Sequence, residues 1–505
     1  MRSSESSDGD TTRRRFLSLT GAGAVGTLTG WIGTGSNDTA DEESFPSYLA
    51  NRVPDLLERY DIPGAAIALV DNGEITWTGA FGEADRRENR PLTTGTLCRP
   101  ESITKSTTAW GVMNLVERGE IELDAPVGHY ITNWDLPETE FDWEDVTTRR
   151  LLTNTAGLPA GIYTNHSPEE TIPSLKQSVN GEAGAPAAPP TDEPGSSFRY
   201  SNPGFVLLEL LIESVTERGY AEYMRAEILE PLGMETTTFE FEEAVRLDLA
   251  TMYDETGEPL PDQHEPPKAH GRLFATVEDI ATFVASGVAG SMGENPGRGV
   301  LKPDSVNIMH SPAVETDGFY GLGSDAYGLG HLVETLPSGQ RAVAHGGQGS
   351  GSWSWYHAVP ETGDGIVVLT NSNRSLQLIA TVVGEWADRQ NFSSVALSRT
   401  YSRVETLSRI SVGVLGITSV GLTWRIFTRV RGKGRLLCPY TRRVPYLRVL
   451  VVGFVVALLY LWWSTLRSTV DLFIPGMTEW LSVAVTITGL LVLVAVATTG
   501  PIDEQ

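Results

Sequence analysis

A serine and a lysine, Ser102 and Lys105, stand three residues apart where apolar spacing predicts a helix to begin, over 102–118. Residues at this spacing share a helix face, so the amine would lie one turn from the hydroxyl. Free backbone N–H groups at a helix N-terminus favour negative charge on an attacked carbonyl oxygen. A desolvated lysine could accept the serine proton, which makes Ser102 a candidate nucleophile. An N-cap serine followed by an unrelated lysine would give the same pattern.

Two further short motifs carry groups suited to the same chemistry. Tyr200 could shuttle protons, and Asn202, two residues on, could hold a substrate amide if the segment is a tight loop before a helix. At the end of a predicted strand, His345 is followed by Gly346, Gly347 and Gln348, and the glycines would let a substrate backbone lie along the strand edge. His345 itself could bind substrate or titrate near neutral pH. Taken alone, each motif also has a purely structural interpretation.

The pattern of apolar and turn residues around these motifs predicts one mixed α/β domain over residues 41–400. A helix at 41–60 precedes strands at 65–70 and 74–80, which are joined by the turn residues Asp71-Asn72-Gly73. Strands at both ends of the domain with helices between them predict an antiparallel sheet built from both ends, flanked by helices and carrying a helical insert. The late strands are predicted at 341–345, 353–359 and 365–370, the further helices at 204–218, 220–229, 277–286 and 376–388, and a long surface loop at 179–197.

In this order and on these elements, the motifs S-x-x-K, Y-x-N and H-x-G resemble those of the serine β-lactamase and penicillin-binding-protein superfamily, most closely its class C-like, esterase branch. The resemblance covers about 45–390 and includes the segments 151–159 and 271–276. It implies a DD-peptidase/β-lactamase-like α/β fold, an acyl-enzyme on Ser102, and neither a cofactor nor a metal. Asn154 stands where the family often has histidine.

The resemblance also implies roles for the other motif residues. Lys105 and Tyr200 would be the proton-transfer pair. His345 stands where β-lactamases carry the lysine of K-T-G, which helps to bind a substrate carboxylate. This departure favours an ester or a D-amino-acid peptide over a β-lactam as the small-molecule or peptide-like acyl substrate. The implied substrate-binding residues are Asn202, His345, Gly347 and Gln348, and the backbone N–H groups of Ser102 and Gln348 would form an oxyanion hole.

Composition excludes several other classes of protein. The 505 residues include 64 Asp and Glu against 38 Lys and Arg, a formal net charge of −26, and so acidic a surface repels nucleic acid. Two cysteines are too few for a disulfide scaffold or a multi-cysteine metal site, and the eight histidines show no ligand spacing. Only five of the basic residues are lysines, a composition typical of halophilic proteins. Protein partners are not predicted.

Residues 401–505 differ from the preceding domain in charge and hydropathy, and they predict a membrane domain in contact with lipid. They carry 11 basic and 5 acidic residues, and three apolar runs occur at about 410–427, 444–463 and 480–498. A membrane-crossing helix needs about 20 apolar residues, so we expect three transmembrane helices. The sequence between the first two runs is basic without an acid, which places it in the cytoplasm and the preceding domain outside.

The N-terminal 40 residues predict an export signal and a linker. Arg13-Arg14-Arg15 precedes a weakly apolar stretch that ends near residue 32, an arrangement typical of twin-arginine signals. An ordinary basic N-terminus is the alternative.

Together these features predict a membrane-anchored extracytoplasmic serine hydrolase that cleaves an ester or D-peptide-like amide bond. The rival hypothesis is a non-catalytic external binding or sensor module, against which the intact Ser102, Lys105 and Tyr200 argue. A Ser-His-Asp hydrolase is disfavoured because no G-x-S-x-G motif occurs. A transporter is disfavoured because no apolar run carries a paired acid or base in its interior.

Overall fold

The computed structural model describes residues 43–497, apart from 133, 135, 162–165, 167–172, 182–188, 262–265, 319, 434–444, 468–469 and 471–474. The predicted twin-arginine segment and most of the basic loop between the first two apolar runs lie outside the described residues, as does part of the predicted surface loop at 179–197.

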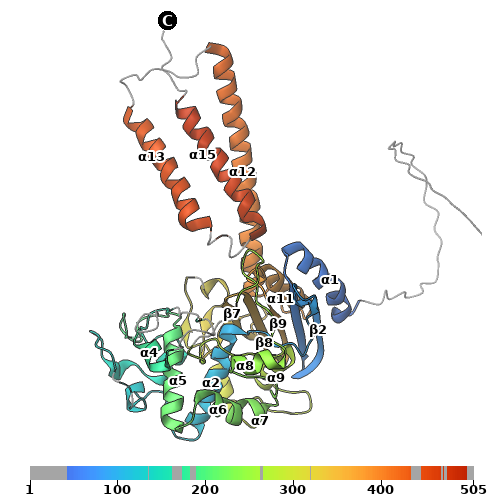
Figure 1. Cartoon of the computed structure of the whole chain (residues 1–505), viewed down its shortest axis with the longest axis vertical. Coiled ribbons are helices and arrows are strands. Elements are labelled where there is room, and N and C mark those ends of the chain that lie inside the picture. Colours follow the sequence, from blue (N-terminus) through green and yellow to red (C-terminus); the bar gives the residue numbers. More distant parts are fainter. Residues whose placement is uncertain are drawn as a thin grey trace, which may run out of the picture. The chain divides into compact units, whose positions relative to one another are not determined.

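A nine-stranded sheet in the order β3-β2-β1-β9-β8-β7-β6-β5-β4 confirms the predicted antiparallel architecture (Figure 1). The hairpin turns at Asn72 and Gly73, both of which have positive φ. The antiparallel pairing of β1 with β9 joins the first part of the domain to its last strand, as the sequence predicts. The predicted strands are observed as β1 (Gly64–Asp71), β2 (Glu74–Asp85), β7 (Arg341–Gly349), β8 (Ser352–Val359) and β9 (Asp364–Thr370).

Four short strands were not predicted, because two to four residues are too few to display the alternation of a strand. They are β3 (Arg90–Pro91), β4 (Val314–Glu315), β5 (Ala326–Tyr327) and β6 (Leu332–Thr335).

The length of β6 has a consequence for the site. β6 pairs with β7 only from Arg341 to Ala344, which leaves the β7 edge from His345 to Gly349 without a strand partner beyond Leu332, the first residue of β6. The prediction that His345 ends its strand is wrong, because β7 continues to Gly349 through its pairing with β8.

Each face of the sheet buries its own apolar cluster. Ala65, Ile67 and Leu69 of β1 lie in the cluster with α1 (Phe45–Tyr60) and α11 (Leu376–Arg389). The alternate β1 residues, Ala66, Ala68 and Val70, lie in the cluster on the other face, which holds side chains from α2 (Thr104–Glu117), α5 (Asn202–Thr216) and α9 (Val277–Ser286). This alternation is what a period of two residues requires of a strand buried on both faces.

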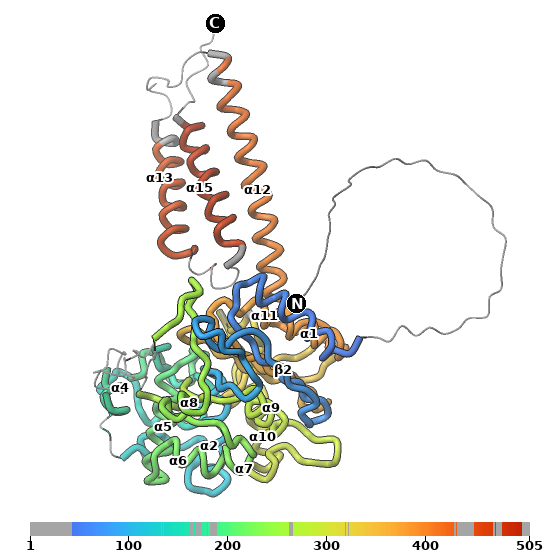
Figure 2. The backbone as a smooth tube through the Cα atoms, turned by 45° about the vertical axis from the view of Figure 1, so that its right-hand side comes forward, coloured from blue at the N-terminus to red at the C-terminus, as the bar shows by residue number. Residues whose placement is uncertain are grey.

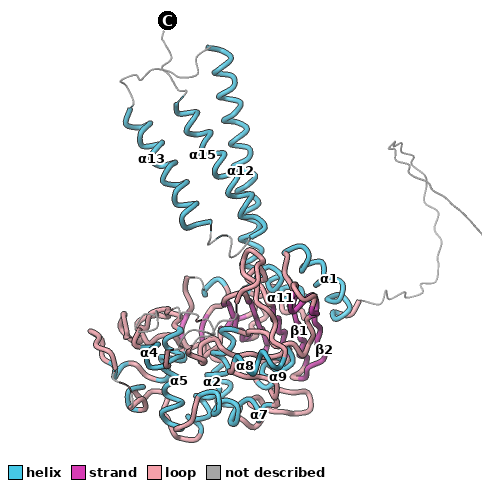
Figure 3. Tube along the Cα trace, viewed as in Figure 1, coloured by secondary structure: helices cyan, strands magenta, loops and turns pink. Residues whose placement is uncertain are grey.

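In chain order the helical insert comes between β3 and β4, and long loops connect its helices (Figure 3). The helix predicted at 220–229 is α6 (Tyr220–Met224) followed by a π-helical turn (Arg225–Leu229). The remaining short helices are α3 (Thr148–Leu152), α4 (Leu175–Val179), α7 (Glu230–Leu232), α8 (Phe241–Leu247) and α10 (Pro303–Met309).

Among the described residues, three helices are long and apolar enough to cross a membrane, over Ala396–Thr428, Val449–Leu466 and Met477–Val496. They belong to α12 (Ala396–Lys433), α13 (Pro445–Leu461) with its following π-helical turn, and α15 (Pro475–Ala497). The helix α15 packs against both others (Figure 2), and a hydrogen bond of 2.8 Å joins the Ser419 and Thr488 hydroxyls. α12 begins before the predicted apolar run and passes without a break through residue 400.

Candidate active site

Ser102 lies in a 3₁₀ turn, Glu101–Ile103, directly before α2. The preceding residue, Glu101, has a φ of 53°, a left-handed conformation that is uncommon outside glycine and that shapes the turn presenting the serine. Lys105, one turn on, is fully buried, and its Nζ donates to Ser102 Oγ (3.0 Å) and to the His270 carbonyl oxygen (2.5 Å). The predicted serine–lysine pair is therefore in direct contact.

The loop that supplies the His270 carbonyl is held by a buried acid that the sequence analysis did not single out. Glu209 on α5 accepts hydrogen bonds from the backbone N–H groups of Lys268 (2.6 Å) and Ala269 (2.8 Å). Thr108 on α2 donates to the Ala269 carbonyl oxygen (2.7 Å). Burial raises the pKa of Glu209 to about 7, which the two N–H groups partly oppose. A lone acid within the apolar face of a predicted helix was the signal available in the sequence.

Tyr200 reaches the site on a loop that Asn154 organises. The Asn154 carbonyl oxygen accepts from the Arg199 N–H (2.8 Å), and its Oδ1 accepts from the Ser201 N–H (2.9 Å). The residue is buried with a φ of 56°, a left-handed conformation that asparagine tolerates better than most residues. Asn202 then begins α5, and its Nδ2 donates to the Gly161 carbonyl oxygen (3.0 Å).

The Tyr200 ring lies between the catalytic lysine candidate and other aromatic rings. Lys105 Nζ is 4.9 Å from the centre of the Tyr200 ring, which stacks on Tyr320 at 4.4 Å between centroids. Desolvation, reinforced by Tyr320 and Tyr327, raises the pKa of Tyr200 well above its ordinary value, and its hydrogen bond with Ser102 opposes this. Tyr200 therefore keeps its proton at neutral pH and presents a hydroxyl group to the site.

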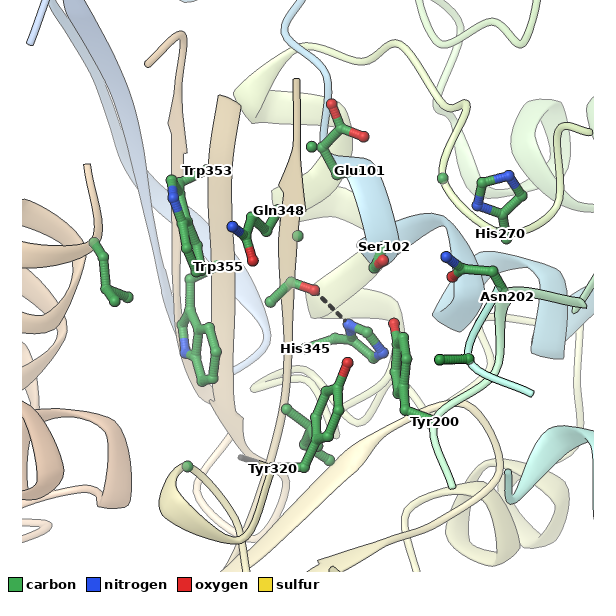
Figure 4. A pocket seen from close by; sticks show the side chains of 18 of the residues that line it. Glu101, Ser102, Tyr200, Asn202, His270, Tyr320, His345, Gln348, Trp353 and Trp355 are labelled. Atoms are coloured by element: carbon green, nitrogen blue, oxygen red, sulfur yellow. Dashed lines mark hydrogen bonds between the residues drawn. The ribbon is translucent and has the colours of Figure 1, made fainter. Parts of the chain in front are cut away.

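His345 is buried and both ring nitrogens are engaged. Nδ1 lies 2.7 Å from the Gly346 carbonyl oxygen, to which it must donate, and Nε2 lies 3.1 Å from the Tyr327 hydroxyl (Figure 4). Burial, with the neighbouring Lys105, lowers the pKa of His345 to about 3. The expectation that His345 titrates near neutral pH is therefore wrong, since its ring is neutral and offers no positive charge to a carboxylate.

Glycines in β7 let the strand lie against the residues that precede the nucleophile. A Cβ on Gly347 would lie 2.0 Å from the Pro100 carbonyl oxygen, and one on Gly349 would lie 2.1 Å from the Glu101 carboxyl carbon. Their cross-strand partners in β8 use the space: Ser354 Oγ donates to the Pro100 carbonyl oxygen (2.5 Å) and Ser352 Oγ to Glu101 (2.6 Å). The free edge of β7 and the nucleophile turn are thus held as one unit.

A cleft of about 920 Å³ collects these groups (Figure 4). Lys105 lies beneath it, in contact with the nucleophile. All of the other predicted site residues line the cleft: Ser102, Tyr200, Asn202, His345, Gly347 and Gln348.

Comparison with known proteins agrees with this geometry. Residues 49–381 match the family model described as Beta-lactamase. The chain is 24% identical to protein flp of Staphylococcus aureus over 353 residues, which cover 67% of this chain and 66% of flp. It is 30% identical to penicillin-binding protein 4* of Bacillus subtilis over 182 residues, 36% of this chain and 38% of that protein.

The chain spans only part of the length of these curated relatives. It covers 36% of one flp sequence and 66% of another. Among solved structures, the octameric penicillin-binding protein homologue from Pyrococcus abyssi superposes with a TM-score of 0.56 at 26% identity, covering 67% of this chain and 77% of that one.

Proposed function

Because the chain belongs to the Beta-lactamase family of serine hydrolases, we propose that it is a membrane-anchored, extracytoplasmic hydrolase that cleaves an ester or D-peptide-like amide bond through an acyl-enzyme on Ser102. The contact of 3.0 Å between Lys105 Nζ and Ser102 Oγ, at the floor of a cleft that runs along a free strand edge, is the observation that carries the proposal.

The first half of the reaction forms the acyl-enzyme. Ser102 Oγ attacks the substrate carbonyl carbon while its proton passes to Lys105 Nζ, the basic side chain in contact with it. The oxyanion lies between the backbone N–H groups of Ser102 and Gln348. As the bond from carbon to the leaving oxygen or nitrogen breaks, Tyr200 donates a proton to the departing group and recovers one from Lys105.

The second half returns the enzyme to its starting state. A water molecule attacks the acyl carbon and gives up a proton to the same pair of residues. The carbon–Oγ bond breaks, the acid leaves, and Ser102 Oγ regains a proton. Asn202 and Gly347 would position the substrate along the β7 edge.

The neutral His345 supports an ester or D-peptide over a β-lactam. A β-lactam carries a carboxylate close to its ring, and the position of the family's lysine is held here by an imidazole with both nitrogens engaged. Binding such a carboxylate in that buried place without a cation would be costly.

The membrane association rests on the three candidate spanning helices. We place the hydrolase domain (41–400) outside the cell and the membrane domain at 401–505, because the basic residues cluster between the first two apolar runs. Twin-arginine export from residues 1–40 and adaptation to high salt belong to the same proposal, supported by the paired arginines and the acidic, lysine-poor composition.

Intact-mass analysis of the full chain in detergent and high salt, after treatment with a fluorophosphonate, tests the proposal. We expect one adduct, lost in Ser102→Ala and kept in Ser338→Ala, which changes an exposed turn serine. A folded protein that takes up no adduct would contradict the hydrolase and favour the binding or sensor module.

A further inference from the structure

The cleft continues past the free edge of β7 to the opposite face of the sheet. Because successive strand residues face opposite sides, His345 and Gly347 share the face of the nucleophile while Gly346 faces away from it. A Cβ on Gly346 would lie 2.6 Å from the Trp355 ring, so this glycine leaves the room that Trp355 occupies. Figure 4 shows Trp353 and Trp355 on the far side of the strand from Ser102. We call this second compartment the distal lobe; its lining includes Trp353, Trp355, Leu376, Leu397 and Tyr401.

The distal lobe is apolar and suited to an uncharged ligand. Leu397 packs against the apolar cluster that contains Trp353 and Trp355. The indole N–H groups of both tryptophans are buried without a hydrogen-bond partner in the described part of the chain, so the two rings contribute apolar surface to the lobe. Arg199 is the one lysine or arginine among the described residues that line the cleft, and it pairs with Asp192 at 2.6 Å.

One wall of the distal lobe is the beginning of the first candidate membrane helix. Leu397 and Tyr401 belong to the first turns of α12. The buried carboxylate of Glu334 on β6 accepts the Ala396 N–H (2.8 Å) and pairs with Arg399 (3.0 Å). These contacts fix the start of α12 to the sheet, within the single compact unit Ser44–Gln505.

The helix geometry places the lobe close to the membrane surface. From Tyr401 to the apolar run that starts at residue 410 there are nine residues of continuous helix, about 14 Å at a rise of ~1.5 Å per residue. The headgroup region on each side of the hydrocarbon core is roughly 5–8 Å thick. A wall of the cleft therefore lies within about 10 Å of the lipid headgroups if the apolar run starts at the hydrocarbon boundary.

We propose that the distal lobe binds the acyl chain of an uncharged, membrane-partitioned ester, which enters along α12 and presents its carbonyl to Ser102 across the β7 edge. The inference rests on the proposed function and narrows its substrate class. In the reaction, the ester C–O bond breaks, Ser102 Oγ takes the acyl group, and the alcohol leaves with the proton from Tyr200. Water then releases the fatty acid.

The test uses the full chain in phosphatidylcholine vesicles with p-nitrophenyl palmitate and p-nitrophenyl butyrate as probes. The quantity measured is the ratio of kcat/KM for the long ester to that for the short ester. Leu397→Trp fills the lobe, and Leu407→Trp is the matched control, since it makes the same change ten residues on at an exposed position outside the cleft. Fluorophosphonate labelling of each variant reports separately on the nucleophile.

We expect the unmodified chain to prefer palmitate, and Leu397→Trp to lower the ratio by about tenfold or more, whereas Leu407→Trp leaves it unchanged. Equal ratios in the two variants, or a preference for butyrate in a chain that labels normally, would overturn the inference and leave the proposed hydrolase standing. Absence of labelling in the unmodified chain would overturn the proposed function and the inference with it.

Discussion

The nucleophile side of the β7 edge and the distal lobe use the same strand in opposite ways. On the nucleophile side, Ser102 and Lys105 are held in one arrangement by hydrogen bonds of 2.5–3.0 Å. The left-handed backbone conformation of Glu101 and the close contact of β7 with the nucleophile turn add to this. In the distal lobe, apolar side chains shape the wall, and two indole N–H groups have no partner among the described residues. A small displacement of the reacting atoms lowers the rate strongly, whereas a compartment that binds a chain by apolar contact accommodates changes of shape. Substitutions on the nucleophile side should therefore lower activity more than substitutions in the distal lobe.

The largest effect is expected from removing the lysine amine. Lys105→Met keeps much of the buried side-chain volume but deletes the group in contact with Ser102 Oγ. The rate of fluorophosphonate labelling should fall by about 10³-fold, as for the loss of a general base. Lys176→Met, at a residue that lines neither part of the cleft, is the control. A labelling rate close to that of the unmodified chain would show that Ser102 is activated by another group.

A methyl group on the strand edge should have the next largest effect. In Gly347→Ala the new Cβ meets the Pro100 carbonyl oxygen at 2.0 Å, so β7 and the nucleophile turn must move apart. A displacement of this kind can lower the labelling rate by about 10²-fold. Gly219→Ala, where a Cβ has no neighbour within 4 Å, is the matched control. If both variants label alike, the close contact between β7 and the nucleophile turn is not required.

The buried Glu209 should make stability depend on pH. Its pKa is raised to about 7 from an ordinary value of 4.5, so between these pH values the folded chain binds a proton that the unfolded chain releases. Its contribution to the unfolding free energy therefore falls as pH rises through this window, by on the order of 3 kcal/mol. Buried His345, with its lowered pKa, acts in the opposite direction between about pH 3 and 6.5.

Glu209→Gln separates these contributions, because its amide oxygen can still accept the two backbone N–H groups. Urea unfolding followed by tryptophan fluorescence from pH 4.5 to 8 should give a stability difference between the two chains that changes steadily with pH. A difference that stays constant across this range would mean that Glu209 ionises in the fold as readily as in the unfolded chain.

The main strands of the sheet and the contact between Ser102 and Lys105 could be predicted from local signals, whereas the meeting of the three motifs in one site was implied only by the family resemblance. The short apolar runs of β1 and β9, the turn residues of the first hairpin and the apolar face of α1 are visible in single segments, and Ser102 and Lys105 meet through helix spacing alone. The distal lobe could not be predicted in this way. It depends on β6 beginning only at Leu332, on the glycine at 346 and on where α12 starts, and none of these has a local pattern in the sequence.

The prediction that His345 titrates near neutral pH was wrong for the same reason. Its residue type permits titration near neutral pH, but only the packed structure supplies the burial, the Gly346 carbonyl and the Tyr327 hydroxyl that hold it neutral. A sequence identifies which group stands at a position, whereas its ionisation depends on neighbours brought from elsewhere in the chain.

Asn154 offers the smallest and most selective test, because it lines no part of the cleft and accepts hydrogen bonds from the backbone on both sides of Tyr200. Asn154→Gly keeps the left-handed φ but loses the Oδ1 that accepts from the Ser201 N–H, so a buried donor is left without its partner at a cost of about 1–3 kcal/mol. If this loosens Tyr200, labelling should slow by about tenfold, and Asn154→Asp, which retains the acceptor, should restore it. A merely structural role would lower the stability of Asn154→Gly without changing the labelling rate of the folded protein. That outcome would mean that the aromatic stack with Tyr320, and not the loop backbone, fixes Tyr200.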